Sequence, residues 1–130
     1  MYILGDIGNT ETKICLVSNR NKIIKKISFS SKEITINKLK KIFNKNKFKF
    51  KDVKKILFCS VVPKSFILIK KFLSEKTKVK CYEVKNLNLK SLIKVKVNYK
   101  QVGSDRITNA ISLMDHKNNF IILDFGTATT

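Results

Sequence analysis

Residues 3–13 combine the side chains that bind phosphate and a divalent metal. An apolar stretch leads into Asp6, which offers a hard carboxylate oxygen to Mg²⁺, and Lys13 follows as a positive charge for phosphate. Gly8 and Asn9 tolerate positive φ, so the sequence predicts a tight hairpin with backbone N–H groups turned toward an anion. One interpretation of the run is therefore a phosphate and metal site.

A second interpretation of this run needs no ligand. Gly8-Asn9 is also typical of an ordinary hairpin, in which Asp6 caps the turn and Glu11 pairs with Lys13 on one face of the second strand. The run by itself favours neither interpretation.

A similar pattern occurs near the end of the chain. Residues 122–129 again contain an apolar stretch, an aspartate, an apolar residue, a glycine and small polar residues. In actin-like and hexokinase-like phosphotransferases, two such turns face each other across a cleft and hold the phosphates of a nucleotide. The repeated pattern therefore favours the phosphate interpretation of residues 3–13.

Four motifs, taken in order, resemble those of the type III pantothenate kinases. They are Asp6-x-Gly8-Asn9-Thr10-x-x-Lys13, Ser60-Val61-Val62-Pro63, Gly103-x-Asp105-Arg106 and Asp124-Phe125-Gly126-Thr127-Ala128-Thr129. The resemblance implies a kinase that phosphorylates pantothenate to 4′-phosphopantothenate with ATP, the first step of coenzyme A biosynthesis.

The resemblance implies that Asp105 is the catalytic base. It would accept the proton of pantothenate's primary hydroxyl as that oxygen attacks the γ-phosphate of ATP. The residues that would border pantothenate are Gly103, Ser104, Asp105 and Arg106. Arg106 fits a carboxylate or another polar group of the substrate. Tyr99 resembles the family's substrate-lining tyrosine, although its connection to Gly103 is shorter than usual and lacks the expected Asn-Pro.

The same resemblance implies ATP, Mg²⁺ and a monovalent cation, K⁺ or NH₄⁺, as cofactors. Asp6 would bind Mg²⁺, Asp124 would hold the monovalent cation, and Thr127 would touch the nucleotide. The expected contacts to ATP in the first turn are Asp6, Ile7, Gly8, Asn9, Thr10, Glu11, Thr12 and Lys13. Family members form homodimers, in which the partner helps to complete the pantothenate pocket.

Several polar residues of the sequence, within these motifs and outside them, suit structural roles that need no substrate. Asp105 suits the first turn of a helix, where the helix dipole favours a carboxylate, and Arg106 is placed to pair with it. Ser60 suits the end of a strand or the entry to a helix. His116, the only histidine, suits the end of a helix.

Periodicity predicts three strands, at residues 2–7, 12–17 and 22–29, that form an antiparallel meander. A helix capped by Ser30-Ser31, with Glu33 in its first turn, should continue to Asn44. Residues 49–55 form a polar connection, and residues 86–96 are ambiguous between extended and helical. The later elements are strands at 56–61, 79–84 and 120–124 and helices at 63–76 and 103–114.

This order predicts the α/β fold of one ribonuclease H-like (actin-like ATPase) unit, in which alternating helices and strands follow the meander. Residues 1–118 would form this unit, and residues 119–130 the first strand and phosphate turn of a second unit. We expect the chain alone to be inactive, because one unit can neither close the cleft nor cover the adenine. The alternatives are a catalytically dead remnant or partner domain and, less favoured, a basic nucleic-acid-binding module.

Length and cysteine content agree with one cytoplasmic domain. The chain has 130 residues, enough for a core. Cys15, Cys59 and Cys81 are widely spaced within apolar runs, which predicts buried free thiols in a reducing compartment. We expect no signal peptide, since Asp6 interrupts the opening apolar run and no small-residue cleavage site follows a longer one. We also expect no membrane-spanning segment, since no apolar run is long enough.

The net charge is +19, from 28 Lys and Arg against 9 Asp and Glu. Only Arg20 and Arg106 are arginines, whereas Lys, Ile and Asn are the residues that an AT-rich genome encodes most. Arginine gives the bidentate contacts of specific recognition, so the charge alone does not predict a specific nucleic-acid partner.

The charge generates the first testable prediction. Binding to DNA or RNA should be weak and independent of sequence, and roughly a few hundred millimolar salt should abolish it, because it would depend on lysine contacts to phosphate. Fluorescence anisotropy with labelled oligonucleotides over a salt series measures this. Nanomolar, salt-resistant and sequence-selective binding would contradict the kinase interpretation.

Overall fold

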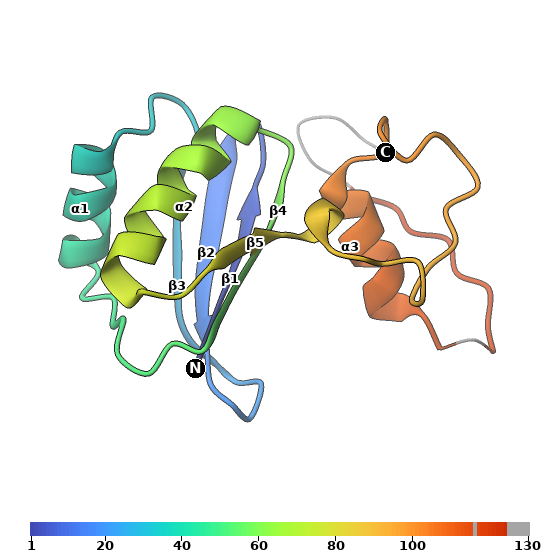
Figure 1. Cartoon of the computed structure of the whole chain (residues 1–130), viewed down its shortest axis with the longest axis horizontal. Coiled ribbons are helices and arrows are strands. Elements are labelled where there is room, and N and C mark those ends of the chain that lie inside the picture. The colour runs from blue at the N-terminus through green and yellow to red at the C-terminus, as the bar shows by residue number, and fades with distance from the viewer. Residues whose placement is uncertain (116, 125–130) are drawn as a thin grey trace.

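The computed structural model describes residues 1–115 and 117–124. A five-stranded sheet of order β3-β2-β1-β4-β5 organises the chain (Figure 1). β1, β2 and β3 are antiparallel, whereas β4 is parallel to β1 and β5 is parallel to β4. The elements are β1 (Tyr2–Ile7), β2 (Glu11–Val17), β3 (Ile23–Ser30), α1 (Ile36–Lys45), β4 (Lys55–Ser60), α2 (Pro63–Thr77), β5 (Cys81–Glu83), the 3₁₀ turn η1 (Val84–Asn86) and α3 (Ser104–Leu113).

Helices α1 and α2 cover one face of the sheet (Figure 1). Side chains alternate along a strand, so every second residue of β1 and β4 points toward these helices. The main core on this face includes Ile3, Ile7, Ile14, Ile56 and Phe58 from the strands and Leu39, Phe43, Ile69, Phe72 and Leu73 from the helices. The core therefore forms where the predicted strands and helical stripes meet.

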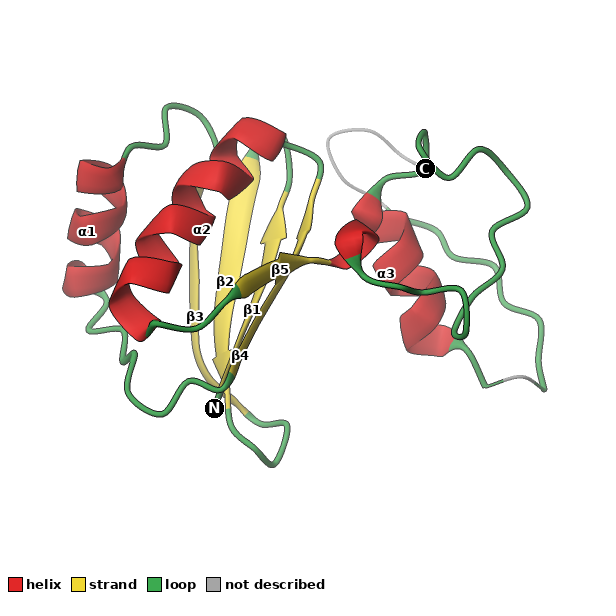
Figure 2. Cartoon of the chain, in the orientation of Figure 1, coloured by secondary structure: helices red, strands yellow, loops and turns green. Residues whose placement is uncertain are grey.

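Helix α3 lies on the opposite face, and the chain around it is mostly loop (Figure 2). Leu57 and Cys59 point to this face and pack against a second cluster formed by Val84, Leu89 and Ile107. This cluster holds α3 beside β4, so that the beginning of the helix reaches the carboxyl end of the strand.

Most of the predicted elements are confirmed within one or two residues. The meander, the strand at 56–61, and the helices at 63–76 and 103–114 correspond to β1–β3, β4, α2 and α3. Pro63 is the first residue of α2, a position that needs no backbone N–H. α2 ends at Lys78, which adopts the left-handed conformation with φ of 60°.

The predicted start of the first helix was wrong. Thr35, rather than Ser30-Ser31, caps α1, and its hydroxyl accepts a hydrogen bond from Lys38 N at 3.1 Å. Ser30 instead ends β3 opposite Glu11, and Glu33 has a φ of 55°, outside the helical region. Strand pairing and the left-handed residue together delay the helix by one turn.

Three further predictions need correction. The strand predicted at 79–84 is shorter, because the chain turns into η1 at Val84, where the carboxylate of Glu83 accepts from Lys85 N. Gly8 and Asn9 were expected to use positive φ, but no glycine of the described residues has positive φ and neither has Asn9. The first hairpin therefore closes without a left-handed residue at these positions. Residues 120–124 are not a strand and pair with no other strand of the described chain, and Ile121 is 90% exposed. The proposed division at residue 118 stays a prediction.

A close approach between β1 and β4 depends on Gly5. Gly5 lies opposite Phe58 in the parallel pair, and the buried Phe58 ring occupies the space beside its Cα. A Cβ at position 5 would overlap this ring, with even Phe58 Cζ only 2.6 Å away. Gly5 therefore lets a large aromatic ring fill the core directly above the central strand.

Gly5→Ala should destabilise the protein by about 1–3 kcal/mol, the usual cost of overpacking, because the Phe58 ring must move. Urea unfolding measures the change. Gly8→Ala is the matched control and should cost less, since its Cβ would meet only Glu11 O, at 3.2 Å. The cost of Gly5→Ala should shrink in a Phe58→Leu background, and an equal cost in both backgrounds would contradict the overlap.

Candidate functional site

Asp6 lies near the carboxyl end of β1 in a row of cross-strand neighbours. Lys13 of β2 is opposite it on one side and Cys59 of β4 on the other, and Ser28 of β3 continues the row beyond Lys13. Because cross-strand partners share a face, these side chains all point away from α1 and α2. Asp6 and Lys13 are exposed. The sheet thus places an exposed carboxylate opposite an exposed lysine.

Cys59 connects Asp6 to the second predicted carboxylate. Its thiol donates a hydrogen bond to Asp6 Oδ1 at 3.4 Å and lies 3.7 Å from Gly5 O. Burial, the charge and hydrogen bond of Asp6, and then the charge of Asp105 raise the pKa of Cys59 from 9.0 to about 12. Both carboxylates therefore raise the pKa of the same thiol, although they are 99 positions apart in the sequence.

The ends of β1, β4 and α3 are joined by backbone hydrogen bonds. Val61 N donates to Ile7 O at 3.0 Å, which continues the pairing of β1 and β4 past the last strand residue. Ser60 N donates to Ser104 Oγ at 2.7 Å, and Ser104 Oγ donates to Ser60 O at 3.0 Å. These contacts fix the first residue of α3 at the end of β4.

Asp105 follows directly and folds back over Gly103. Its Oδ1 accepts a hydrogen bond from Arg106 N at 2.8 Å, and a Cβ on Gly103 would collide with this oxygen. Arg106 itself is exposed and forms no ion pair with Asp105, since Lys13–Glu11 is the only ion pair within the described residues. The absence of a side chain at Gly103 therefore leaves room for the Asp105 carboxylate.

The hairpin between β1 and β2 contains the ion pair of Glu11 with Lys13 that is expected of an ordinary hairpin without a bound ligand. Lys13 Nζ lies 3.5 Å from Glu11 Oε2, and Gly8 N donates to Glu11 O at 3.0 Å. Two predicted nucleotide contacts have buried side chains. Ile7 belongs to the core, and the Thr12 hydroxyl is bonded to Ser31 Oγ at 2.7 Å. Asn9 and Thr10 remain exposed at the tip of the hairpin.

The second predicted turn is only partly described. Asp124 accepts a hydrogen bond from Asn109 Nδ2 of α3 at 3.4 Å and is half-buried. Thr127 and His116 lie outside the described residues. No group of three or more His, Cys, Asp and Glu side chains arranged to hold a metal occurs in residues 1–115 and 117–124.

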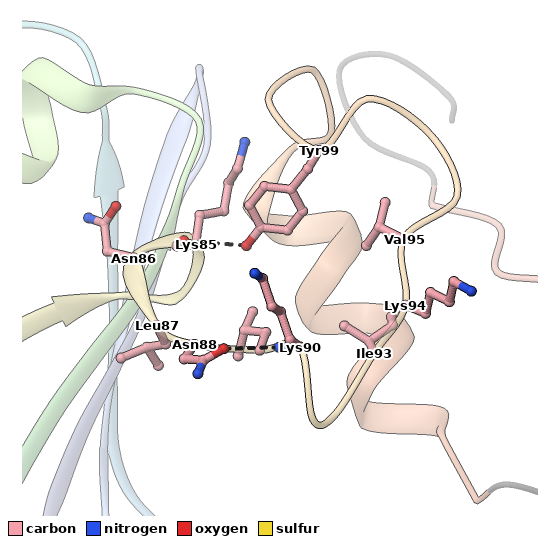
Figure 3. A pocket seen from close by; sticks show the side chains of 10 residues that line it. Lys85, Asn86, Leu87, Asn88, Lys90, Ile93, Lys94, Val95 and Tyr99 are labelled. Carbon is pink, nitrogen blue, oxygen red and sulfur yellow. Dashed lines mark hydrogen bonds between the residues drawn. The ribbon is translucent and has the colours of Figure 1, made fainter.

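Tyr99 lines a separate cavity of about 650 Å³, which is not lined by residues 103–106 (Figure 3). Its hydroxyl donates to Lys85 O at 3.3 Å, and Lys85 Nζ lies 5.3 Å from the centre of its ring. Lys85 Nζ also donates to Val102 O at 2.7 Å. Tyr99 and Lys85 thus hold the loop that leads into Gly103, and no contact places Tyr99 beside Asp105.

Two site features were missed in the sequence. The first is Cys59, which directly precedes the motif that begins at Ser60. Strand alternation would have placed its side chain on the face opposite Phe58. Its contact with Asp6 could not have been found this way, because it depends on the parallel register of β1 and β4. The partner of Ser104 is the backbone of Ser60, for which the sequence carries no signal. The structural interpretation of Ser60 is supported, since its hydroxyl accepts from Val62 N at 3.1 Å at the entry to α2.

An α/β unit with a carboxylate at the end of its first strand, and a second one at a helix start beside it, is consistent with the N-terminal unit of an actin-like ATPase. Comparison with known proteins is more specific. The profile of the type III pantothenate kinase family matches residues 2–130, so the chain belongs to this family.

Two relatives are similar over the whole chain. The type III pantothenate kinase of Pelagibacter ubique (strain HTCC1062) is 58% identical over 130 residues, and that of Desulforapulum autotrophicum (strain ATCC 43914 / DSM 3382 / VKM B-1955 / HRM2) is 31% identical over 137 residues. In each case the match covers 100% of this chain and 52% of the relative. The chain therefore spans about half the length of the curated relatives it matches. Among the described residues, no helix combines the length and apolar character needed to cross a bilayer.

The raised pKa of Cys59 predicts its reactivity. A thiol whose pKa rises from 9.0 to about 12 has about a thousandfold less thiolate at pH 8, so Cys59 should react slowly with iodoacetamide in the folded chain and normally in urea. Asp6→Asn removes one of the charges that raise this pKa and should speed the reaction. Mass spectrometry of tryptic peptides over time measures both rates.

Cys81 is the internal control. Its pKa is also raised to about 12, by burial and without a contribution from Asp6, so Asp6→Asn should leave its alkylation rate unchanged. If the substitution left Cys59 equally slow, or accelerated both thiols alike, the contact between Asp6 and Cys59 would be contradicted.

Proposed function

We propose that this chain forms the first unit of a kinase that transfers the γ-phosphate of ATP to the primary hydroxyl of pantothenate. The observation that carries the proposal is that Asp6 and the start of α3 meet at the end of β4. The Cys59 thiol donates to Asp6, and Ser60 N donates to Ser104, the residue before Asp105. Phosphoryl transfer needs a metal-binding carboxylate and a base at one site. Membership of the type III pantothenate kinase family supports the choice of substrate.

The two carboxylates have different surroundings that suit different roles. Asp105 is half-buried at the start of α3 and is assigned as the base that takes the hydroxyl proton. Asp6 is exposed beside Lys13, so its carboxylate fits a hydrated Mg²⁺ while the ammonium group faces phosphate. When bound, Mg²⁺ would neutralise charge on the phosphates.

The remaining contacts follow the same arrangement. The exposed tip of the hairpin, Asn9 and Thr10, is assigned to the ATP phosphates, and so is Lys13 after it leaves Glu11. Residues whose side chains are buried, Ile7 and Thr12, would contribute only backbone groups. Thr127 is assigned to the nucleotide.

Arg106 and the K⁺ or NH₄⁺ site complete the assignment. The guanidinium of Arg106 is exposed and unpaired with a carboxylate in the described chain, so it is available to the carboxylate of pantothenate. Asp124 is assigned to the monovalent cation together with oxygen ligands from elsewhere. Tyr99 would need to leave Lys85 O to line the substrate pocket.

The active assembly requires more than this unit. The chain spans about half of its relatives, and the apolar side chains of residues 120–123 are exposed, as expected of a segment that a second unit covers. We propose that the complete enzyme is a homodimer in the cytoplasm. The free thiols of Cys15, Cys59 and Cys81 agree with a reducing compartment.

The test joins this chain to the remaining half of the Pelagibacter ubique relative. This chimera should form 4′-phosphopantothenate, measured by mass spectrometry, whereas the chain alone should not. In the chimera, Asp105→Asn should lower kcat by roughly two to four powers of ten with little change in KM for ATP, the signature of a lost general base. Asp6→Asn should raise KM for ATP as well as lower kcat.

Asp52→Asn is the matched control, because Asp52 lies in an exposed loop where its φ of 60° suits asparagine. It should leave both constants unchanged. Identical profiles for the Asp105 and Asp6 variants would contradict the two roles. An inactive chimera beside an active Pelagibacter enzyme would instead indicate that the chain is a catalytically dead remnant.

A further inference from the structure

The beginning of α3 lacks the usual side-chain cap. Gly103 occupies the N-cap position and has no side chain that could accept from the first N–H groups of the helix. The helix start is held instead by the next residue, Ser104, the first residue of α3. Its side chain is 1% exposed, so its hydroxyl is removed from solvent.

The Ser104 hydroxyl forms two hydrogen bonds with one residue. It accepts from Ser60 N at 2.7 Å and donates to Ser60 O at 3.0 Å, two hydrogen bonds that we call the Ser104 bridge. A hydroxyl has only one hydrogen to donate, and in Ser104 that hydrogen is committed to the strand. The side chain therefore cannot donate to pantothenate or ATP without breaking the bridge.

The bridge connects the two predicted functional residues. Ser60 follows Cys59, whose thiol donates to Asp6, and Ser104 precedes Asp105. A shift of α3 along β4 would therefore change the position of Asp105 relative to Asp6. The other contacts of α3 with β4 are apolar, through Ile107 and its cluster, and such contacts are not directional.

We propose that Ser104 is a positioning residue, whose bridge to the Ser60 backbone fixes the carboxylate of Asp105 relative to Asp6, rather than a residue that contacts pantothenate. This inference rests on the proposed function for its effect on catalysis. The bridge itself does not, because it can be measured in the chain without substrate.

The first experiment measures the bridge by amide hydrogen exchange of the 130-residue chain, followed by NMR. Ser60 N–H should be protected in the parent chain, and Ser104→Ala should accelerate its exchange at least tenfold. Ser112→Ala is the matched control, because Ser112 lies on the same helix, is exposed and donates only to Asn109 O. Unchanged protection of Ser60 in Ser104→Ala would overturn the proposal.

The second experiment measures the consequence in the chimera. Ser104→Ala should lower kcat by roughly tenfold to a hundredfold, as misplacement of a catalytic group does, with KM for pantothenate and for ATP nearly unchanged. Ser104→Cys keeps the size of the side chain with weaker hydrogen bonds, so it should have an intermediate kcat. It also serves if Ser104→Ala does not fold.

The outcomes separate the two proposals. A rise in KM for pantothenate with kcat unchanged would assign Ser104 to substrate contact and overturn the positioning role. If Ser104→Ala lost the protection of Ser60 N–H but kept its kcat, while Asp105→Asn remained inactive, the positioning role would also be overturned. The proposed function would then stay intact. If Asp105→Asn also retained full activity, the proposed function would fail instead.

Discussion

The parallel pairing of β1 with β4 is the constraint on which the rest of the structure depends. Six residue pairs, from Tyr2 opposite Lys55 to Ile7 opposite Ser60, place Asp6 beside Cys59 and end both strands at one level. A slip of one residue would turn Phe58 out of the core and move Cys59 to the wrong face. Packing of the core and placement of the carboxylates are therefore set by the same register.

That register requires a residue without a side chain at the centre of β1. Gly5 leaves the space that the Phe58 ring fills, and Gly103 leaves the space into which Asp105 folds back. Both glycines have negative φ, so their function is the absence of a side chain rather than backbone freedom. At Gly5 the missing side chain allows the Phe58 ring to pack on the sheet, and at Gly103 it allows the Asp105 carboxylate to lie close to the start of α3.

The sequence predicted elements where a local pattern decides them, and failed where distant residues do. Alternation and helical spacing located β1–β4, α2 and α3. Motif spacing singled out Asp6 and Asp105, whose roles stay a prediction, and both carboxylates raise the pKa of the Cys59 thiol. The start of α1 was misplaced because pairing of Ser30 with Glu11, a tertiary effect, overrode the local capping signal. The bridge from Ser104 to Ser60 and the contact of Cys59 with Asp6 link residues 44 and 53 positions apart, so no window of the sequence contains them.

The separation between those residues also has a consequence for how the chain folds. The meander of β1–β3 is formed by neighbours in sequence, whereas the site needs β4 to pair with β1 and α3 then to dock on β4. Contacts between distant segments carry a larger loop-closure cost, so we expect the meander to form early and the site to be completed last. During synthesis, the nascent chain would thus have a nearly finished hairpin sheet long before Asp105 has left the ribosome.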